Sequence, residues 1–142
     1  MKNIKILVVD DESMLCDFAR TVLEERGFNV ITAYSGDDGM RKLEANPDIE
    51  VILADVNCAE GNGMDGIDLA RKVRELDKLR EHATPIVFMS GRIAPHRPSE
   101  LDALSAFQIA KPFNREDLAG TIRAAYIAAN TTPAPLETLK TA

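Results

Sequence analysis

Five short apolar runs set the strongest limit on what this chain can fold into. They span residues 4–9, 29–33, 51–54, 86–89 and 107–110, and the first is almost entirely apolar and rich in β-branched residues. Runs of this kind are typical of parallel strands that are covered on both faces. The fifth run is the weakest strand signal because it is short and contains Gln108.

Helical patterns fill the intervals between these runs. We expect helices over residues 13–26, from Ser35 or Gly36 to just before Asn46, over 67–79, over 99–104, and from Asn114 to residue 130. Ser13 is expected to cap the first helix, and Gly27 stands where a left-handed C-terminal cap belongs. Alternating strands and helices predict an α/β fold, a (βα)5 doubly wound five-stranded parallel sheet with right-handed crossovers.

The length and composition fit one domain, which we expect to occupy residues 1–130. The chain has 142 residues, of which 45% are hydrophobic and 28% charged, as in a globular fold with a core. Residues 131–142 contain two prolines and show little periodicity. We therefore expect a flexible tail or a truncated linker there.

Charge and hydropathy exclude some classes of protein. The formal net charge is −6 and no run of Lys or Arg is present, which argues against direct binding of nucleic acid. No apolar run approaches the ~18 residues of a membrane-spanning helix, and the N-terminus lacks the features of a secretory signal. These observations favour a cytoplasmic protein without membrane insertion. In that compartment Cys16 and Cys58 are expected to be buried or idle thiols.

Polar side chains follow four of the five expected strands, at the point where each strand ends. Asp10 and Asp11 follow the first strand, Asp55 the third, Ser90 the fourth and Lys111 the fifth. Sites in open parallel sheets form beyond the carboxyl ends of the strands. We therefore expect these five side chains to converge on one edge of the sheet.

This set of side chains indicates phosphoryl chemistry. Three neighbouring carboxylates repel one another unless some are protonated or a cation holds them together. Oxygen ligands alone favour a hard ion such as Mg²⁺. The ammonium of Lys111 and the hydroxyl of Ser90 can stabilise a phosphoryl group in transfer. Asp55 ends the central strand and is the expected acceptor, which would give an acyl phosphate.

Several motifs in this order carry a resemblance to a known family. They are Asp10-Asp11 after Ile-Leu-Val-Val, Asp55 after Val-Ile-Leu-Ala, Met64-Asp65-Gly66, Thr84-Pro85-Ile86 leading to Ser90-Gly91, and Lys111-Pro112-Phe113. Over roughly residues 4–128 the chain resembles the response-regulator receiver domain of two-component signalling, which has a flavodoxin-like fold. The resemblance implies that Mg²⁺ is the cofactor.

The resemblance also implies a role for each acidic position. Asp11 would bind Mg²⁺ directly, whereas Asp10 would act largely through water. Asp55 would be both the phosphoacceptor and a metal ligand, and the backbone carbonyl of Asn57 would supply a further ligand. All four positions are filled in the family's order.

Two further residues and the partners follow from the same resemblance. Ser90 would be the switch hydroxyl, Lys111 would contact the phosphoryl oxygens, and the Lys111–Pro112 bond would be cis. The phosphoryl group would come from a histidine kinase or a histidine phosphotransfer protein, and the switched chain would bind a downstream protein target. Such a regulator catalyses only its own phosphorylation and dephosphorylation, and we do not expect an enzyme in the usual sense.

The chain departs from the family's pattern at three places. Residues 58–63 make the loop after Asp55 longer than usual, Gln108 stands where the family usually has an aromatic residue, and the segment before the fifth strand is rich in proline.

Two alternative functions remain. One is a receiver-like protein-interaction module that does not use phosphorylation. The other is a metal-dependent phosphatase with an aspartyl-phosphate intermediate, which would need a second acid where Asn57 stands. The complete set of acids, serine and lysine favours the phosphorylated switch.

Overall fold

The structure, a computed structural model, describes residues 3–58, 63–91, 103–104 and 106–130. The expected helix over residues 99–104 lies almost entirely outside the described residues, and so does the expected tail over 131–142. Both therefore remain expectations.

All five expected strands are present in one parallel sheet. They are β1 (Lys5–Val9), β2 (Asn29–Ala33), β3 (Val51–Asp55), β4 (Ile86–Ser90) and β5 (Phe107–Ala110). Their order across the sheet is β2-β1-β3-β4-β5, and every neighbouring pair is parallel. The third and fourth strands run one residue further than expected, so that Asp55 and Ser90 belong to the strand ends themselves.

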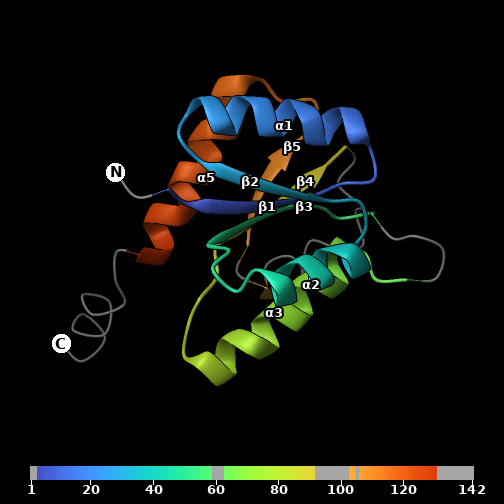
Figure 1. The fold of residues 1–142 in the computed structure, drawn as a ribbon, viewed down its shortest axis with the longest axis vertical. Coiled ribbons are helices and arrows are strands. Elements are labelled where there is room, and N and C mark those ends of the chain that lie inside the picture. The colour runs from blue at the N-terminus through green and yellow to red at the C-terminus, as the bar shows by residue number, and fades with distance from the viewer. Residues whose placement is uncertain (1–2, 59–62, 92–102, 105, 131–142) are drawn as a thin grey trace.

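Helices cover both faces of the sheet, as a doubly wound fold requires. They are α1 (Ser13–Glu25), α2 (Gly36–Ala45), α3 (Gly66–Arg80) and α5 (Arg115–Asn130). Figure 1 shows α1 and α5 on one face and α2 and α3 on the other. Alternate residues of β1 serve the two layers, because Ile6 and Val8 pack with α1 and α5 while Leu7 and Val9 pack with α2 and α3. The predicted fold class is confirmed.

The helix ends follow the predicted signals at most positions. The hydroxyl of Ser35 accepts the N–H of Asp38 at 3.1 Å, and Asn114 Oδ1 accepts the N–H of Asp117 at 2.8 Å. Gly27 has a φ of 91°, the left-handed conformation expected after α1.

The expected cap at Ser13 is wrong. Helix α1 begins at Ser13, and Glu12 occupies the capping position without a side-chain cap. The carbonyl of Glu12 already accepts the N–H groups of Leu15 and Cys16, so the first turn starts one residue earlier than the sequence indicated. The N–H of Glu12 donates in turn to Asp10 Oδ1 at 2.9 Å, the local contact that an aspartate makes with the N–H two residues on.

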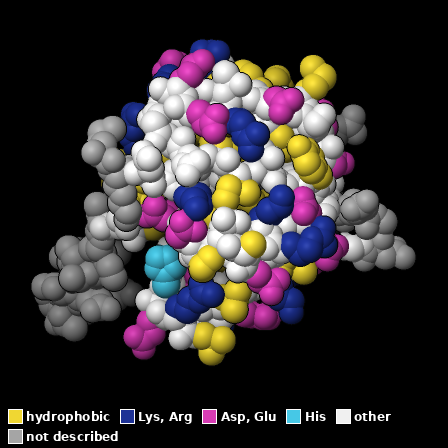
Figure 2. All heavy atoms as spheres, viewed as in Figure 1, with side chains coloured by type: hydrophobic (Ala, Val, Ile, Leu, Met, Phe, Trp, Pro, Cys, Tyr) yellow, Lys and Arg dark blue, Asp and Glu magenta, His cyan; other side chains and the backbone are white. Residues whose placement is uncertain are grey.

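The surface agrees with the charge analysis. On the face drawn in Figure 2, acidic and basic side chains are interspersed with apolar ones and form no single basic field. Across the described ranges, no helix combines the length and apolar character needed to cross a membrane.

Strand register places the ends of four segments side by side. Val9 pairs with Ala54, Asp55 with Met89, and Ser90 with Ala110. The N–H of Lys111 then donates to the carbonyl of Ser90 at 2.9 Å. The residues that follow β1, β3, β4 and β5 therefore reach the same edge of the sheet.

One close backbone contact fixes the start of α3 against the end of β3. A Cβ added at Gly66 would lie 2.0 Å from the backbone carbonyl oxygen of Asp55 and 3.3 Å from the Cα of Val56. No side chain fits there without displacing backbone. The glycine is therefore needed for α3 to start directly beside Asp55.

We predict that Gly66→Ala lowers the free energy of unfolding by about 1–3 kcal/mol, because the added methyl overpacks the backbone of Asp55. Gly120 is the matched control, since it lies on the exposed side of α5 with nothing within 4 Å of an added Cβ. Gly120→Ala should raise stability by up to about 1 kcal/mol through helix propensity. Urea unfolding measures both, and similar midpoints for the two variants would contradict the close contact.

Candidate functional site

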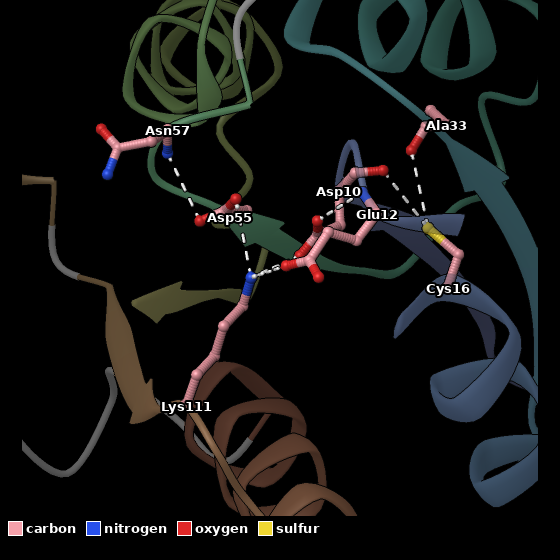
Figure 3. Close-up of polar contacts among 7 residues, drawn as sticks. All are labelled: Asp10, Glu12, Cys16, Ala33, Asp55, Asn57 and Lys111. Carbon is pink, nitrogen blue, oxygen red and sulfur yellow. Dashed lines mark hydrogen bonds and ion pairs between the residues drawn. The ribbon is translucent and has the colours of Figure 1, made fainter. Parts of the chain in front are cut away.

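The centre of the site is a contact between a buried carboxylate and a lysine from the far end of the chain. Asp10 is completely buried, and its Oδ2 lies 2.7 Å from Nζ of Lys111 (Figure 3). The other carboxylate oxygen of Asp10 accepts the N–H of Glu12 at 2.9 Å. Burying a carboxylate requires a partner of opposite charge or a set of hydrogen bonds, and Asp10 has both.

Asp55 lies next to this pair at the end of β3. Its side chain is largely buried, and its Oδ2 is 3.6 Å from Nζ of Lys111. The N–H of Asn57 reaches Oδ1 of Asp55 at 3.4 Å, a long hydrogen bond. Figure 3 shows the amide side chain of Asn57 directed away from the cluster. Only the backbone of Asn57 is therefore placed near the carboxylates.

Three carboxylates gather in a space that suits one cation. One oxygen each of Asp10, Asp11 and Asp55 lie within 4.8 Å of one another. Their combined negative charge exceeds the single positive charge of Lys111, so a further cation would relieve repulsion among them. An all-oxygen donor set next to an exposed side chain, Asp11, fits a hard ion that keeps part of its water, as Mg²⁺ does.

Burial, and after it the presence of Asp10, shifts the pKa values of the neighbouring acids. Burial, and then the charge of Asp10, raise the pKa of Asp55 above its ordinary value of 3.8. Burial, and then a hydrogen bond with Asp10, also raise the pKa of Asp11. Burial works against the charge of Lys111, but its hydrogen bond with Asp10 and the charge of Asp55 raise the pKa of its ammonium nonetheless. The lysine is thus held as a cation beside Asp55, whose pKa is raised.

Ser90 ends β4 beside the same edge, and its side chain is largely buried. It lies one residue beyond Met89, which pairs with Asp55. The structure therefore brings five predicted residues to one edge, and Asn57 follows Asp55 by two. The Lys111–Pro112 bond is cis, as expected. Gln108 is exposed on β5.

The sequence did not predict that Glu12 and Cys16 contact this site. The carboxylate of Glu12 lies 3.6 Å from Nζ of Lys111, although the sequence indicated only an acid near a helix start. The thiol of Cys16 is buried as expected, and Sγ lies 3.4 Å from the backbone carbonyl oxygen of Asp10. Burial raises the pKa of this thiol to about 11, so it packs as a neutral donor. The only sequence feature that could have predicted the contact of Glu12 with Lys111 is its position close to Asp10.

Comparison with known proteins places this geometry in a family. The sequence profile of the response regulator receiver domain matches residues 6–123. The chain belongs to this family of signalling domains.

Curated relatives are response regulators of bacteria. The chain is 32% identical over 126 residues to the transcriptional regulatory protein CpxR of Escherichia coli K12, an alignment that covers 84% of the chain and 48% of CpxR. It is 34% identical over 131 residues to the transcriptional regulatory protein YvrH of Bacillus subtilis, covering 87% of the chain and 49% of YvrH. The chain thus spans about half the length of these relatives.

Solved structures show the same fold. The chemotaxis protein CheY4 of Vibrio cholerae superposes with a TM-score of 0.76 at 28% identity, over 87% of this chain and 99% of CheY4. A CheY-like receiver domain protein of Methanospirillum hungatei gives a TM-score of 0.78 at 26% identity, over 90% of this chain and 97% of that protein. Because these alignments cover nearly the whole of each solved chain, the similarity describes a complete receiver fold.

The raised pKa of Asp55 predicts a pH dependence of stability without metal. A carboxyl whose folded-state pKa is raised favours folding most below its unfolded pKa, and this contribution is lost as pH rises through the folded pKa. In the presence of a chelator, Asp55→Asn should therefore be more stable than the parent at neutral pH. The difference should shrink as pH falls toward 3.8.

Asp48 is the control of opposite sign, because its hydrogen bond with Lys5 lowers its pKa. Asp48→Asn should be no more stable than the parent at neutral pH. Urea midpoints measured across the acid range report both variants. If Asp55→Asn were the less stable protein at neutral pH, the repulsion among the carboxylates would not be as described.

Proposed function

We propose that the chain is a phosphoryl-accepting switch of a two-component system or phosphorelay, formed by residues 1–130 and phosphorylated on Asp55. The observation that carries this proposal is the position of the Asp55 carboxylate. It ends the central strand, it lies within 4.8 Å of oxygens of Asp10 and Asp11, and Nζ of Lys111 is 3.6 Å away. The family membership supports the same function.

Each group has a defined task in this proposal. A carboxylate oxygen of Asp55 forms the bond to phosphorus while the donor's phosphorus–nitrogen bond breaks, and the leaving nitrogen keeps the electron pair. Mg²⁺, held by Asp11, Asp55 and the backbone carbonyl of Asn57 with Asp10 acting largely through water, would neutralise charge on the phosphoryl oxygens. Lys111 contacts one of these oxygens, and it is already held between Asp10 and Asp55.

The surface beside the acceptor supports a protein as the phosphoryl donor. A hollow next to the site is lined by Met14, Leu15, Phe18, Pro112 and Phe113 together with Glu12, Gly91 and Lys111. Met14 is 83% exposed, and the rings of Phe18 and Phe113 lie 6.3 Å apart. Exposed apolar side chains continuous with a polar site are typical of protein contacts. A histidine kinase or a histidine phosphotransfer protein would dock here and present its phosphohistidine.

The output is a change in binding to a downstream protein. In this proposal the hydroxyl of Ser90, the last residue of β4, contacts the phosphoryl group and begins the switch. Residues 92–102 of the segment that follows β4 lie outside the described residues. The chain acts on itself, by taking up and losing the phosphoryl group, and we expect it to do so in the cytoplasm.

The proposal predicts one site of modification. Incubation with a small phosphodonor and Mg²⁺ should add the mass of one phosphoryl group to the intact chain, and a chelator should prevent this. Asp55→Asn should abolish the added mass, because the amide is not a nucleophile for phosphorus. Asp48→Asn, which removes an exposed carboxylate between α2 and β3, should label like the parent. Equal labelling of Asp55→Asn and the parent would rule out this acceptor.

A further inference from the structure

The start of α3 lies against the end of β3. A Cβ added to Gly66, the first residue of α3, would lie 2.0 Å from the backbone carbonyl oxygen of Asp55, the last residue of β3. The β3–α3 loop connects these two residues. The first turn of α3 is therefore in direct backbone contact with the residue that we propose as the acceptor. A shift of this turn toward β3 would displace the backbone of Asp55 and Val56.

The two ends of the loop are held by different means. At the near end, Val56 and Cys58 are buried and pack in the same apolar cluster as Ile67. At the far end, Met64 is held through its backbone by the start of α2. The N–H of Gly36 donates to the Met64 carbonyl at 3.0 Å, and the N–H of Met64 donates to Asp37 Oδ2 at 2.8 Å.

These two hydrogen bonds hold the backbone of Met64 tightly against the start of α2. A Cβ added at Gly36 would lie 2.3 Å from the Met64 carbonyl oxygen, so the two backbones touch. A hydrogen bond to an ionised acceptor is roughly twice as strong as a neutral one, and the N-terminus of α2 stabilises the negative charge of Asp37. The carboxylate of Asp37 therefore forms a strong hydrogen bond with the backbone of Met64.

A second acid in the same turn serves a different purpose. Asp38 accepts the N–H of Tyr34 at 3.1 Å and pairs with Arg41 at 3.3 Å. Both contacts are local, because Arg41 belongs to α2 and Tyr34 lies two residues before its start. Of these two neighbouring acids, Asp37 is the one bound to the loop.

We propose that Asp37 is a positioning residue for the phosphoacceptor site. It fixes Met64, and through Gly66 it fixes the backbone of Asp55 and Val56 in the place that Mg²⁺ binding requires. This assignment rests on the proposed function, because it concerns the geometry of the same site. Loss of the contact lets the loop end move and misplaces the backbone carbonyl of Asn57, while the side chains of Asp55 and Lys111 stay intact.

This assignment predicts that loss of the Asp37 contact changes the affinity for Mg²⁺ but not the rate of phosphorylation at saturating Mg²⁺. Asp37→Ala should weaken Mg²⁺ binding about tenfold, the effect of losing one hydrogen bond to a charged acceptor. The rate of phosphorylation at saturating Mg²⁺ should stay close to that of the parent. Exchange of the Met64 amide should accelerate in the metal-free protein, because its hydrogen bond is lost.

Three variants test this assignment. Asp37→Asn keeps a side-chain oxygen that accepts the same N–H, so it should restore most of the Mg²⁺ affinity. Asp38→Ala removes the neighbouring acid of the same helix turn and should leave both Mg²⁺ affinity and Met64 exchange unchanged. Asp37→Ser, with a shorter side chain suited to a helix start, replaces the alanine variant if that protein does not fold.

The measurements are Mg²⁺ calorimetry, amide exchange without metal, and labelling rate as a function of Mg²⁺ concentration. Parent-like affinity in Asp37→Ala, or an equal loss in Asp38→Ala, would overturn the assignment while the parent still binds Mg²⁺ and labels. A parent that neither binds Mg²⁺ nor takes up the phosphoryl group would overturn the proposed function, and the assignment with it.

Discussion

The ion pair between Asp10 and Lys111 is the contact on which the rest of the site depends. Asp10 has no exposed surface, so its carboxylate is stable only with a cation and hydrogen bonds close by. Lys111 supplies the cation from 101 residues further along the chain, at 2.7 Å. The same ammonium is 3.6 Å from Asp55, which makes it the common partner of two carboxylates that repel each other. A site assembled in this way carries excess negative charge. A divalent cation would neutralise that excess, and this neutralisation is needed before an anionic phosphoryl group can approach.

The fold delivers these groups through backbone register rather than through loops. Parallel pairing sets the ends of neighbouring strands among β1, β3, β4 and β5 within one residue of each other, so the acids and the lysine that follow them meet at one edge. Gly66 then lets α3 begin against Asp55, and Gly36 with Asp37 holds the end of the intervening loop. The backbone of Asp55 is thus in direct contact with the start of α3, while Asp11 and Asn57 remain exposed to solvent.

Much of this was predictable because it depends on local pattern. Apolar runs locate the strands, and parallel strand ends must share an edge, so the convergence of Asp10, Asp55 and Lys111 followed from the sequence. Even the weak fifth strand was correctly bounded, since an edge strand needs only Ile109 buried and tolerates Gln108 on its exposed side. The start of α1 was wrong because the carbonyl of Glu12 already accepts the first helical N–H groups. The contacts of Glu12 and Asp37 were missed because each joins a side chain to an ammonium or a backbone N–H from another segment. Hydrophobic periodicity along the sequence does not predict contacts between segments of this kind.

The central claim is that Asp10, Asp11 and Asp55 form one cation site whose repulsion a divalent ion relieves. Thermal unfolding of the parent and of Asp11→Ala, each with a chelator and with excess Mg²⁺, tests it directly, because a ligand bound only by the folded state raises the melting temperature. We expect Mg²⁺ to raise the melting temperature of the parent but not that of Asp11→Ala. Asp11→Ala should be at least as stable as the parent in chelator. A parent melting temperature that does not respond to Mg²⁺ would contradict a cation site at these three carboxylates.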